Sequence, residues 1–168
     1  MNTQIKLTSF SGKIMYFNGM YKLPVAPYPT VNAILAQNKE SIYMRLCNFK
    51  KILTDEIQEM DDITERLQAR EADPHGEIDT LTELADLLGD IVIYCASEMI
   101  KFGIPFDKTL DIIMQSNFSK LDAAGNPIYN EMGKVMKGPY YYKPEIALKL
   151  MLLEEIDYGK GTSPGLEK

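Results

Sequence analysis

The chain has 168 residues, of which 45% are hydrophobic, and this is enough to build the core of one domain. Its formal net charge of -6 argues against a nucleic acid or an anionic membrane as a partner. No segment approaches the length of a transmembrane helix, and residues 1–10 lack the apolar run of a signal peptide. Cys47 and Cys95 lie in apolar segments, which predicts buried, reduced thiols and a cytoplasmic protein.

Residues 1–38 contain several helix breakers. They are Gly12, Gly19, Pro24, Pro27 and Pro29. We therefore predict an irregular N-terminal extension over 1–38, with a short helix near Phe17–Tyr21.

Two long helices are predicted next, over 39–69 and 78–102, because apolar residues recur there every three or four positions. The first stripe is Ile42, Leu46, Phe49, Leu53, Met60, Ile63 and Leu67. The second is Leu81, Ala85, Leu88, Val92, Cys95, Met99 and Phe102. A turn at Asp73–Gly76 separates the two helices, and Gly103 ends the second one.

A third helix is predicted over 105–120, with Pro105 at its first position, and a last helix over 145–158. Residues 122–142 between them predict an ordered loop with a small hairpin, and 159–168 a flexible tail. The predicted fold is all-α, a helical bundle of antiparallel helices, with one domain over 39–158.

Carboxylates interrupt both long apolar stripes. Glu56 occupies a position where the spacing of the first stripe calls for an apolar residue, and Glu59 points the same way one turn later. In the second helix, Glu83, Asp86 and Asp90 are three and four residues apart on one face. Apolar residues surround Asp90 on nearly every side, which predicts that this carboxylate is buried and needs a partner.

Divalent cations can balance these acids, since carboxylate oxygens suit Mg²⁺ or Mn²⁺. The alternative is a solvated acidic face, which is common in a chain with 24 Asp and Glu residues. Carboxylates that interrupt the apolar stripes of two consecutive helices favour the metal site over the solvated face. A di-iron site in a helical bundle needs Glu-x-x-His motifs, whereas the single histidine, His75, lies in the predicted turn and is expected at the surface.

A cationic cluster is predicted further along the chain. Asn117 and Lys120 share one face of the third helix, and Lys134 and Lys137 flank flexible glycines. Lysines beside glycines suit a phosphate, although a helix C-terminus and ordinary surface lysines would explain the same residues. The carboxylate metal site and this cationic cluster together fit a polyphosphate substrate.

The segment Asp55-Glu56-Ile57-Gln58-Glu59, followed by Glu83-Leu84-Ala85-Asp86, resembles the MazG-like branch of the all-α nucleoside triphosphate pyrophosphohydrolases, whose superfamily includes dimeric dUTPases and phosphoribosyl-ATP pyrophosphohydrolase. The stretches 116–121, 125–129 and 133–139 are similar to the phosphate-binding end of one MazG-like subgroup. Asp55 stands where the family pattern has glutamate, and residues 1–38 have no counterpart.

The resemblance implies two or more Mg²⁺ ions per site, with Mn²⁺ as a substitute, and a homodimer or homotetramer that completes the bundle. It implies these metal ligands: Glu56, Glu59, Glu83 and Asp86. It implies phosphate contacts from Asn117 and Lys120, with Tyr129, Lys134 and Lys137 as further candidates and Asp90 as a supporting residue. Asp55, Glu56 and Glu59 form the expected catalytic group, in which Glu56 or Asp55 would orient the attacking water.

The expected activity is hydrolysis of a nucleoside triphosphate to the monophosphate and pyrophosphate. A purine deoxynucleotide such as dGTP is placed first, ahead of dUTP and dCTP. Phe17, Tyr21, Phe49 and Tyr140–Tyr142 are candidates for stacking on the base. The alternatives are a phosphoribosyl-ATP pyrophosphohydrolase and a non-catalytic helical oligomer that binds ions for stability.

Overall fold

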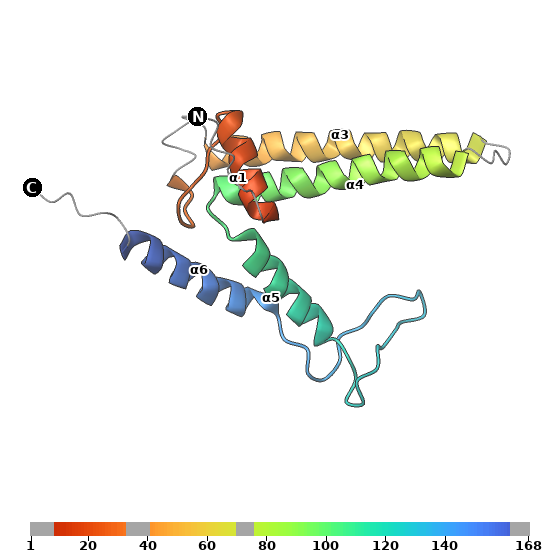
Figure 1. Ribbon diagram of the computed structural model, residues 1–168. Coiled ribbons are helices and arrows are strands. Elements are labelled where there is room, and N and C mark those ends of the chain that lie inside the picture. Colours follow the sequence, from red (N-terminus) through yellow and green to blue (C-terminus); the bar gives the residue numbers. More distant parts are fainter. Residues whose placement is uncertain (1–8, 33–40, 70–75, 162–168) are drawn as a thin grey trace, which may run out of the picture. The chain divides into compact units, whose positions relative to one another are not determined.

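The computed structural model describes residues 9–32, 41–69 and 76–161. Its helices are α1 (Phe10–Met20), α3 (Ile42–Ala69), α4 (Gly76–Lys101), α5 (Phe106–Phe118) and α6 (Pro144–Gly161) (Figure 1). Within those ranges there is no β-strand, only two isolated bridges, so the all-α prediction is confirmed. The chain divides into two compact units. The first unit comprises residues 1–26 and 31–102, and the second comprises 27–30 and 103–168.

Helix α1 begins earlier than predicted. Ser9 caps it, because its Oγ accepts a hydrogen bond from the backbone N–H of Gly12 at 3.1 Å. The expectation that residues before Phe17 are irregular is therefore wrong for residues 10–16. Ile14 and Asn18 are buried on the inner face of this helix, so α1 belongs to the packed part of the first unit.

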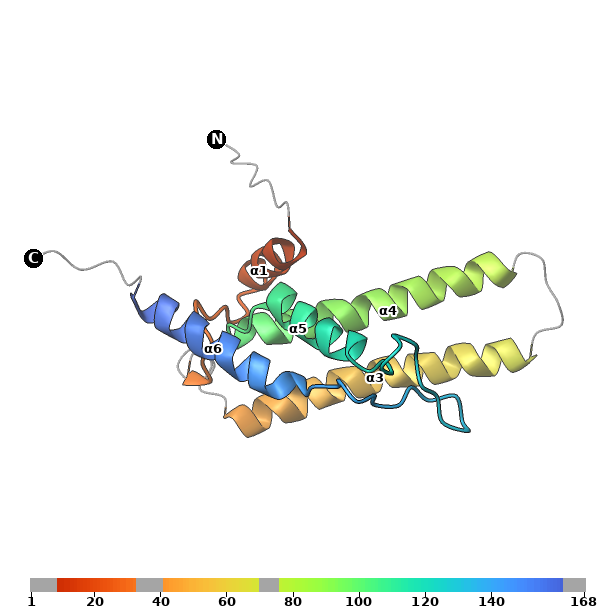
Figure 2. The same cartoon turned by 90° about the horizontal axis from the view of Figure 1, so that it is seen from below.

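Helices α3 and α4 run side by side as an antiparallel pair (Figures 1 and 2). Two ion pairs set their register. Arg45 near the start of α3 bonds Glu98 near the end of α4 at 2.7 Å, and Arg66 near the end of α3 bonds Glu83 near the start of α4 at 3.0 Å. The stretch of both helices between these ion pairs carries the predicted carboxylates.

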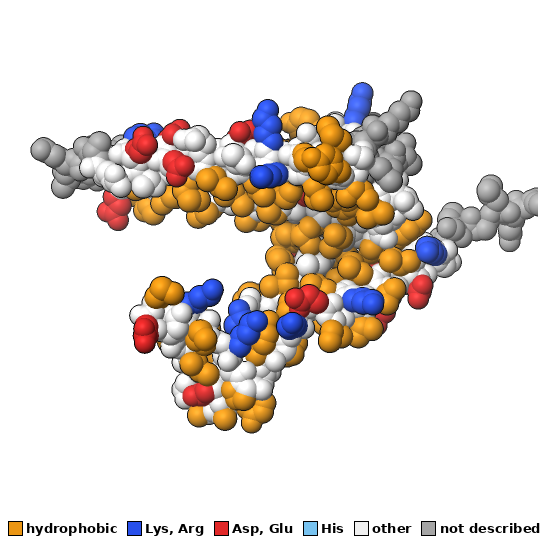
Figure 3. All heavy atoms as spheres, turned by 180° about the vertical axis from the view of Figure 1, so that it is seen from behind, with side chains coloured by type: hydrophobic (Ala, Val, Ile, Leu, Met, Phe, Trp, Pro, Cys, Tyr) orange, Lys and Arg blue, Asp and Glu red, His pale blue; other side chains and the backbone are white. Residues whose placement is uncertain are grey.

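Helix α4 has two apolar faces, and the predicted stripe marks the exposed one. Leu87 is 1% exposed in the first unit, whereas Leu81 and Leu88 are each 53% exposed and Val92 is 47% exposed. Hydrophobic side chains accordingly gather along the long helical pair in Figure 3. Asp90 is half-buried rather than buried, because its apolar neighbours Leu88 and Val92 face outward.

In the second unit α5 packs against α6, and an ion pair between Lys108 and Glu155 joins them. Gly103 takes a left-handed φ of 68° just after α4, as the predicted helix stop requires. A Cβ there would lie 2.2 Å from the carbonyl oxygen of Tyr28, so only glycine fits this close approach.

Other predictions have mixed outcomes. The thiol of Cys47 is exposed, not buried, and Cys95 is half-buried. Residues 73–75 of the predicted turn, including His75, lie outside the described residues. Of the predicted tail, residues 159–161 extend α6, and residues 162–168 lie outside the described residues. Among the described residues, no helix is long and apolar enough to cross a membrane.

Candidate active site

Helix α3 supplies Glu56 to the carboxylate group between the two ion pairs. Glu56 is half-buried, which agrees with its place in the apolar stripe, whereas its neighbours Asp55 and Glu59 are exposed. Glu59 also lines an open depression of about 520 Å³ together with Asp62, Glu65 and Arg66. Of these three carboxylates, Glu56 is therefore the least exposed.

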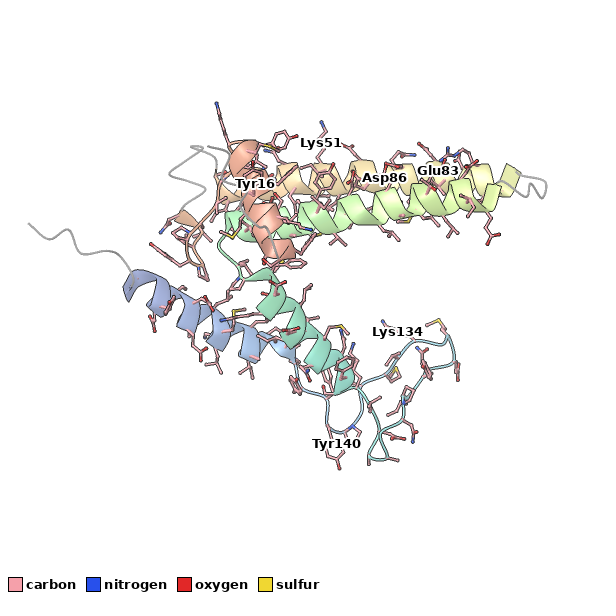
Figure 4. The ribbon with its side chains drawn as sticks, in the orientation of Figure 1. Tyr16, Lys51, Glu83, Asp86, Lys134 and Tyr140 are labelled. Atoms are coloured by element: carbon pink, nitrogen blue, oxygen red, sulfur yellow. The ribbon has the colours of Figure 1, made fainter. Side chains whose placement is uncertain are left out.

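Helix α4 supplies Asp86, which is exposed, and Asp90, which is half-buried. Glu83 and Asp86 project from α4 one turn apart (Figure 4). Asp90 follows Asp86 by four residues, so these two side chains lie on the same line along the helix. This line faces the region where α3 carries Glu56.

Glu56 experiences the combined negative field of both helices. Burial raises its pKa above the ordinary value of 4.5, and the charges of Asp90, Glu59, Asp55 and Asp86 raise it further. Among the predicted metal ligands, Glu59 and Asp86 thus act on the charge of Glu56. Asp55 and Asp90 act on it in the same way. A raised pKa moves a carboxylate toward the range in which it accepts a proton effectively.

Glu83 is the predicted ligand that the structure places differently. Its Oε2 accepts a hydrogen bond from Nη2 of Arg66 at 3.0 Å, and its Oε1 forms an ion pair with Nη1 at 3.0 Å. Glu83 is also missing from the groups that raise the pKa of Glu56. In this state Glu83 therefore balances Arg66 rather than adding to the charge around Glu56.

The donor set fits a hard divalent cation in its chemistry, since it consists of carboxylate oxygens whose repulsion such an ion would relieve. Its geometry is not assembled: in residues 9–32, 41–69 and 76–161, no group of three or more Asp, Glu, His or Cys side chains could hold an ion as it stands. Closure around a metal ion would require rotation of exposed side chains such as Glu59 and Asp86.

The predicted phosphate-binding residues all lie in the second unit. Lys120 follows α5, and its Nζ donates to Oδ1 of Asn117 at 2.7 Å. Ser116 and Ser119 tie the end of the loop to α5, because Ser116 Oγ donates to the Tyr142 carbonyl at 2.8 Å and Ser119 Oγ accepts from the Tyr142 N–H at 3.2 Å. These two hydrogen bonds therefore anchor the far end of the loop 120–142 at the C-terminal end of α5.

Two similar turns, eight residues apart, shape this loop. Asp122 Oδ1 accepts from the N–H groups of Ala124 and Asn126 at 2.8 Å each. Asn130 Oδ1 accepts from the N–H groups of Met132 and Lys134 at 3.1 and 2.8 Å. Each turn has a glycine in the left-handed region at its fourth position, Gly125 with φ 86° and Gly133 with φ 75°. Isolated bridges at Leu121↔Pro127 and Tyr129↔Val135 close the two turns, so the predicted hairpin is a pair of tight turns.

The remaining predicted contacts sit on these turns. Tyr129 is 58% exposed, and the side chain of Lys134 lies at the rim of the second turn (Figure 4). Lys137 Nζ lies 4.6 Å from the ring centroid of Tyr141, a cation–π contact that holds it beside an aromatic side chain.

Sequence reasoning missed Tyr94. It follows Asp90 by four residues on α4, so the helical spacing that found Asp90 also reaches Tyr94. Burial raises the pKa of the Tyr94 phenol, and the charges of Asp90, Glu56 and Glu59 raise it further.

No protein-family model matches this chain, and no curated protein matches it. The chain is similar to a solved structure from Exiguobacterium sp. 255-15, described as a "putative NTP pyrophosphohydrolase", with 20% sequence identity and a TM-score of 0.49. The similarity covers 89% of this chain and 98% of the other.

Proposed function

We propose that this chain hydrolyses a nucleoside triphosphate to the monophosphate and pyrophosphate with Mg²⁺ or Mn²⁺, and that purine deoxynucleotides such as dGTP are its preferred substrates. The observation that carries the proposal is the half-buried Glu56, whose pKa is raised by burial and by four neighbouring carboxylates from two helices. Carboxylates whose pKa values are raised by burial and by like charges cluster at functional sites.

Glu56, Glu59 and Asp86 would hold the metal ions, with Glu83 joining them after release from Arg66. Bound ions would neutralise the phosphate oxygens and make a bound water more acidic. Glu56 or Asp55 would orient the attacking water and accept its proton, and the raised pKa of Glu56 supports that residue for the role. Asp55, the next residue, adds to the field that raises this pKa.

The cations of the second unit would bind the phosphates that leave as pyrophosphate. Lys120 has its ammonium positioned by Asn117, and Lys134 and Lys137 lie in or just after a turn whose backbone is fixed by Asn130. Fixed cations lose little conformational entropy on binding an anion. This arrangement supports a phosphate-binding role for the segment 117–137.

A second copy of the chain is the proposed partner, as a homodimer or homotetramer. Ile78, Leu81, Leu88 and Val92 follow one line along α4 and are 66%, 53%, 53% and 47% exposed. An apolar line of this length on a helix is typical of an interface between copies. Light scattering on the purified chain tests this, and replacement of Leu81 and Leu88 by glutamate should lower the measured mass to that of a monomer.

Pyrophosphate release from a panel of ribo- and deoxynucleoside triphosphates tests the activity. The panel includes phosphoribosyl-ATP, and each reaction contains Mg²⁺, Mn²⁺ or a chelator. Wild type should release pyrophosphate with either metal and none with chelator. Glu59→Gln should lose most of the activity, whereas the matched control Asp61→Asn, an exposed acid on α3, should retain it. Metal binding without turnover of any nucleotide would instead show a structural ion site.

A further inference from the structure

A cavity of about 360 Å³ opens in the first unit among residues of α1, α3 and α4. Four aromatic side chains line it: Phe17 and Tyr21 from α1 and its C-terminal cap, Phe49 from α3, and Tyr94 from α4. The rings of Phe17 and Tyr21 are tilted by 50° with their centroids 4.7 Å apart, so together they form one wall. Such a wall suits a flat, aromatic ligand.

Charged groups line the same cavity with an excess of positive charge. Glu98 accepts from Nε and Nη2 of Arg45 at 2.7 Å each and from Nζ of Lys101 at 3.0 Å. The three side chains are 7%, 13% and 7% exposed. One carboxylate thus faces two cations in a region of low exposure. A guanidinium carries five N–H donors, and Glu98 accepts two of those of Arg45.

A buried polar pair holds the aromatic wall in place. Asn18 is 0% exposed, and its side-chain amide donates to the Ser97 carbonyl at 3.2 Å while its Oδ1 accepts from Ser97 Oγ at 2.6 Å. This pair fastens α1 to α4 on the part of α1 that carries Phe17.

The cavity and the carboxylate group lie along the same two helices. On α4, Asp90, Tyr94 and Glu98 follow one another at four-residue spacing. On α3, Arg45, Phe49, Ile52 and Glu56 follow at spacings of four, three and four. A ligand with its ring in the cavity would thus extend its other end along the helices toward Glu56.

We propose that this cavity binds the base of the nucleotide substrate and favours a base that presents carbonyl oxygens, with guanine as the purine of that kind. This inference rests on the proposed hydrolysis and assigns the base recognition of that same site. Arginine and lysine are the side chains that donate to the carbonyl and ring-nitrogen acceptors of guanine. Adenine and cytosine present an amino donor at the corresponding edge, which the cationic groups would oppose.

Binding of nucleosides in the absence of metal tests the cavity apart from catalysis. Deoxyguanosine and deoxyadenosine are titrated into the chelator-treated chain and followed by NMR. Deoxyguanosine should bind more tightly, and Tyr21→Ala should weaken it by about tenfold through lost stacking. The control Tyr16→Ala removes a ring from the same helix that is 52% exposed and does not line the cavity, so binding should be unchanged (Figure 4).

Steady-state kinetics test the assignment in the working enzyme. The ratio of kcat/KM for dGTP over dATP should fall toward one in Tyr21→Ala and in Arg45→Lys, which keeps the charge beside Glu98 but loses the planar fork. The control Tyr16→Ala, which removes a ring outside the cavity, should keep the wild-type ratio.

The possible outcomes separate the two proposals. Normal turnover with an unchanged dGTP-to-dATP ratio in both variants overturns the base site and leaves the hydrolysis intact. Nucleoside binding that Tyr21→Ala abolishes, without turnover of any triphosphate, overturns the hydrolysis and supports the cavity as a base site.

Discussion

Arg66 on α3 and Glu83 on α4 form a two-pronged ion pair, with Nη1 to Oε1 and Nη2 to Oε2 each at 3.0 Å. Glu83 is one of the four expected metal ligands, so in this state the guanidinium occupies the oxygens that a metal ion would use. The side chains are 56% and 36% exposed, and an ion pair this exposed contributes little to stability. It can therefore open at small cost when a divalent cation competes for Glu83.

Arg66→Gln should increase the affinity for Mg²⁺, because it frees Glu83 and removes a positive charge beside the site. We expect the Mg²⁺ concentration for half-maximal pyrophosphate release to fall several-fold. Lys51→Gln is the matched control, since it removes an exposed charge from the same helix (Figure 4). Equal Mg²⁺ requirements in wild type and Arg66→Gln would show that Glu83 is not a ligand.

Glu56→Gln should stabilise the metal-free protein. The pKa of Glu56 is raised in the folded chain, so its ionised form is disfavoured there relative to the unfolded chain. The folded state consequently loses stability as the pH rises from 4.5 through the folded pKa, and glutamine avoids this loss.

In thermal unfolding with chelator at pH 8, we expect the Tm of Glu56→Gln to exceed that of wild type by about 2 °C. The gain should disappear below pH 4.5, where Glu56 is protonated in both states. Added Mg²⁺ should stabilise wild type more than the variant. A lower Tm for the metal-free variant at pH 8 would contradict a repulsive cluster.

The two turns of the 121–137 loop should respond differently to acid. Hydrogen bonds from the backbone N–H groups of Asn126 and Ala124 lower the pKa of Asp122 below its ordinary value of 3.8. The stability that the Asp122 carboxylate gives its turn is present above pH 3.8 and is lost as the pH falls through the lowered pKa. Asn130 makes the same contacts with an amide that does not titrate.

Chemical shifts of backbone amides measured from pH 6 to pH 2 check this difference. The amides of Ala124 and Asn126 should shift at the low end of the titration, and those of Met132 and Lys134 should not. Asp122→Asn should remove the transition from the first turn. A common transition in both turns would mean that the loop unfolds as a whole and that Asp122 is not its cause.

Periodicity predicted the long helices because α3 and α4 each carry many turns of apolar repeats, and their bounds agree within a few residues. It could not tell which apolar face of α4 packs against α3, since Leu87 and Leu88 are equally apolar and only the partner helix distinguishes them. Helix α1 was largely missed because its glycines outweighed the N-terminal cap at Ser9.

The candidate site was likewise predicted from the sequence only in part. Glu56 was found because its helical position calls for an apolar residue, and it is half-buried as that position implies. The ion pair of Arg66 with Glu83 joins residues 17 positions apart on different helices, so it depends on a register that no local pattern encodes. The aromatic cavity likewise combines α1, α3 and α4, although Phe17, Tyr21 and Phe49 were recognised as candidates for the base.

Pyrophosphate release by Glu56→Gln shows whether the carboxylates of α3 and α4 support metal-dependent hydrolysis. The assay compares wild type, Glu56→Gln and Asp61→Asn with dGTP and Mg²⁺, after thermal unfolding has shown that all three are folded. We expect wild type and Asp61→Asn to release pyrophosphate at similar rates and Glu56→Gln to be at least about a hundredfold slower, as for loss of a general base. Release by Glu56→Gln at the wild-type rate would mean that this carboxylate has no part in the hydrolysis.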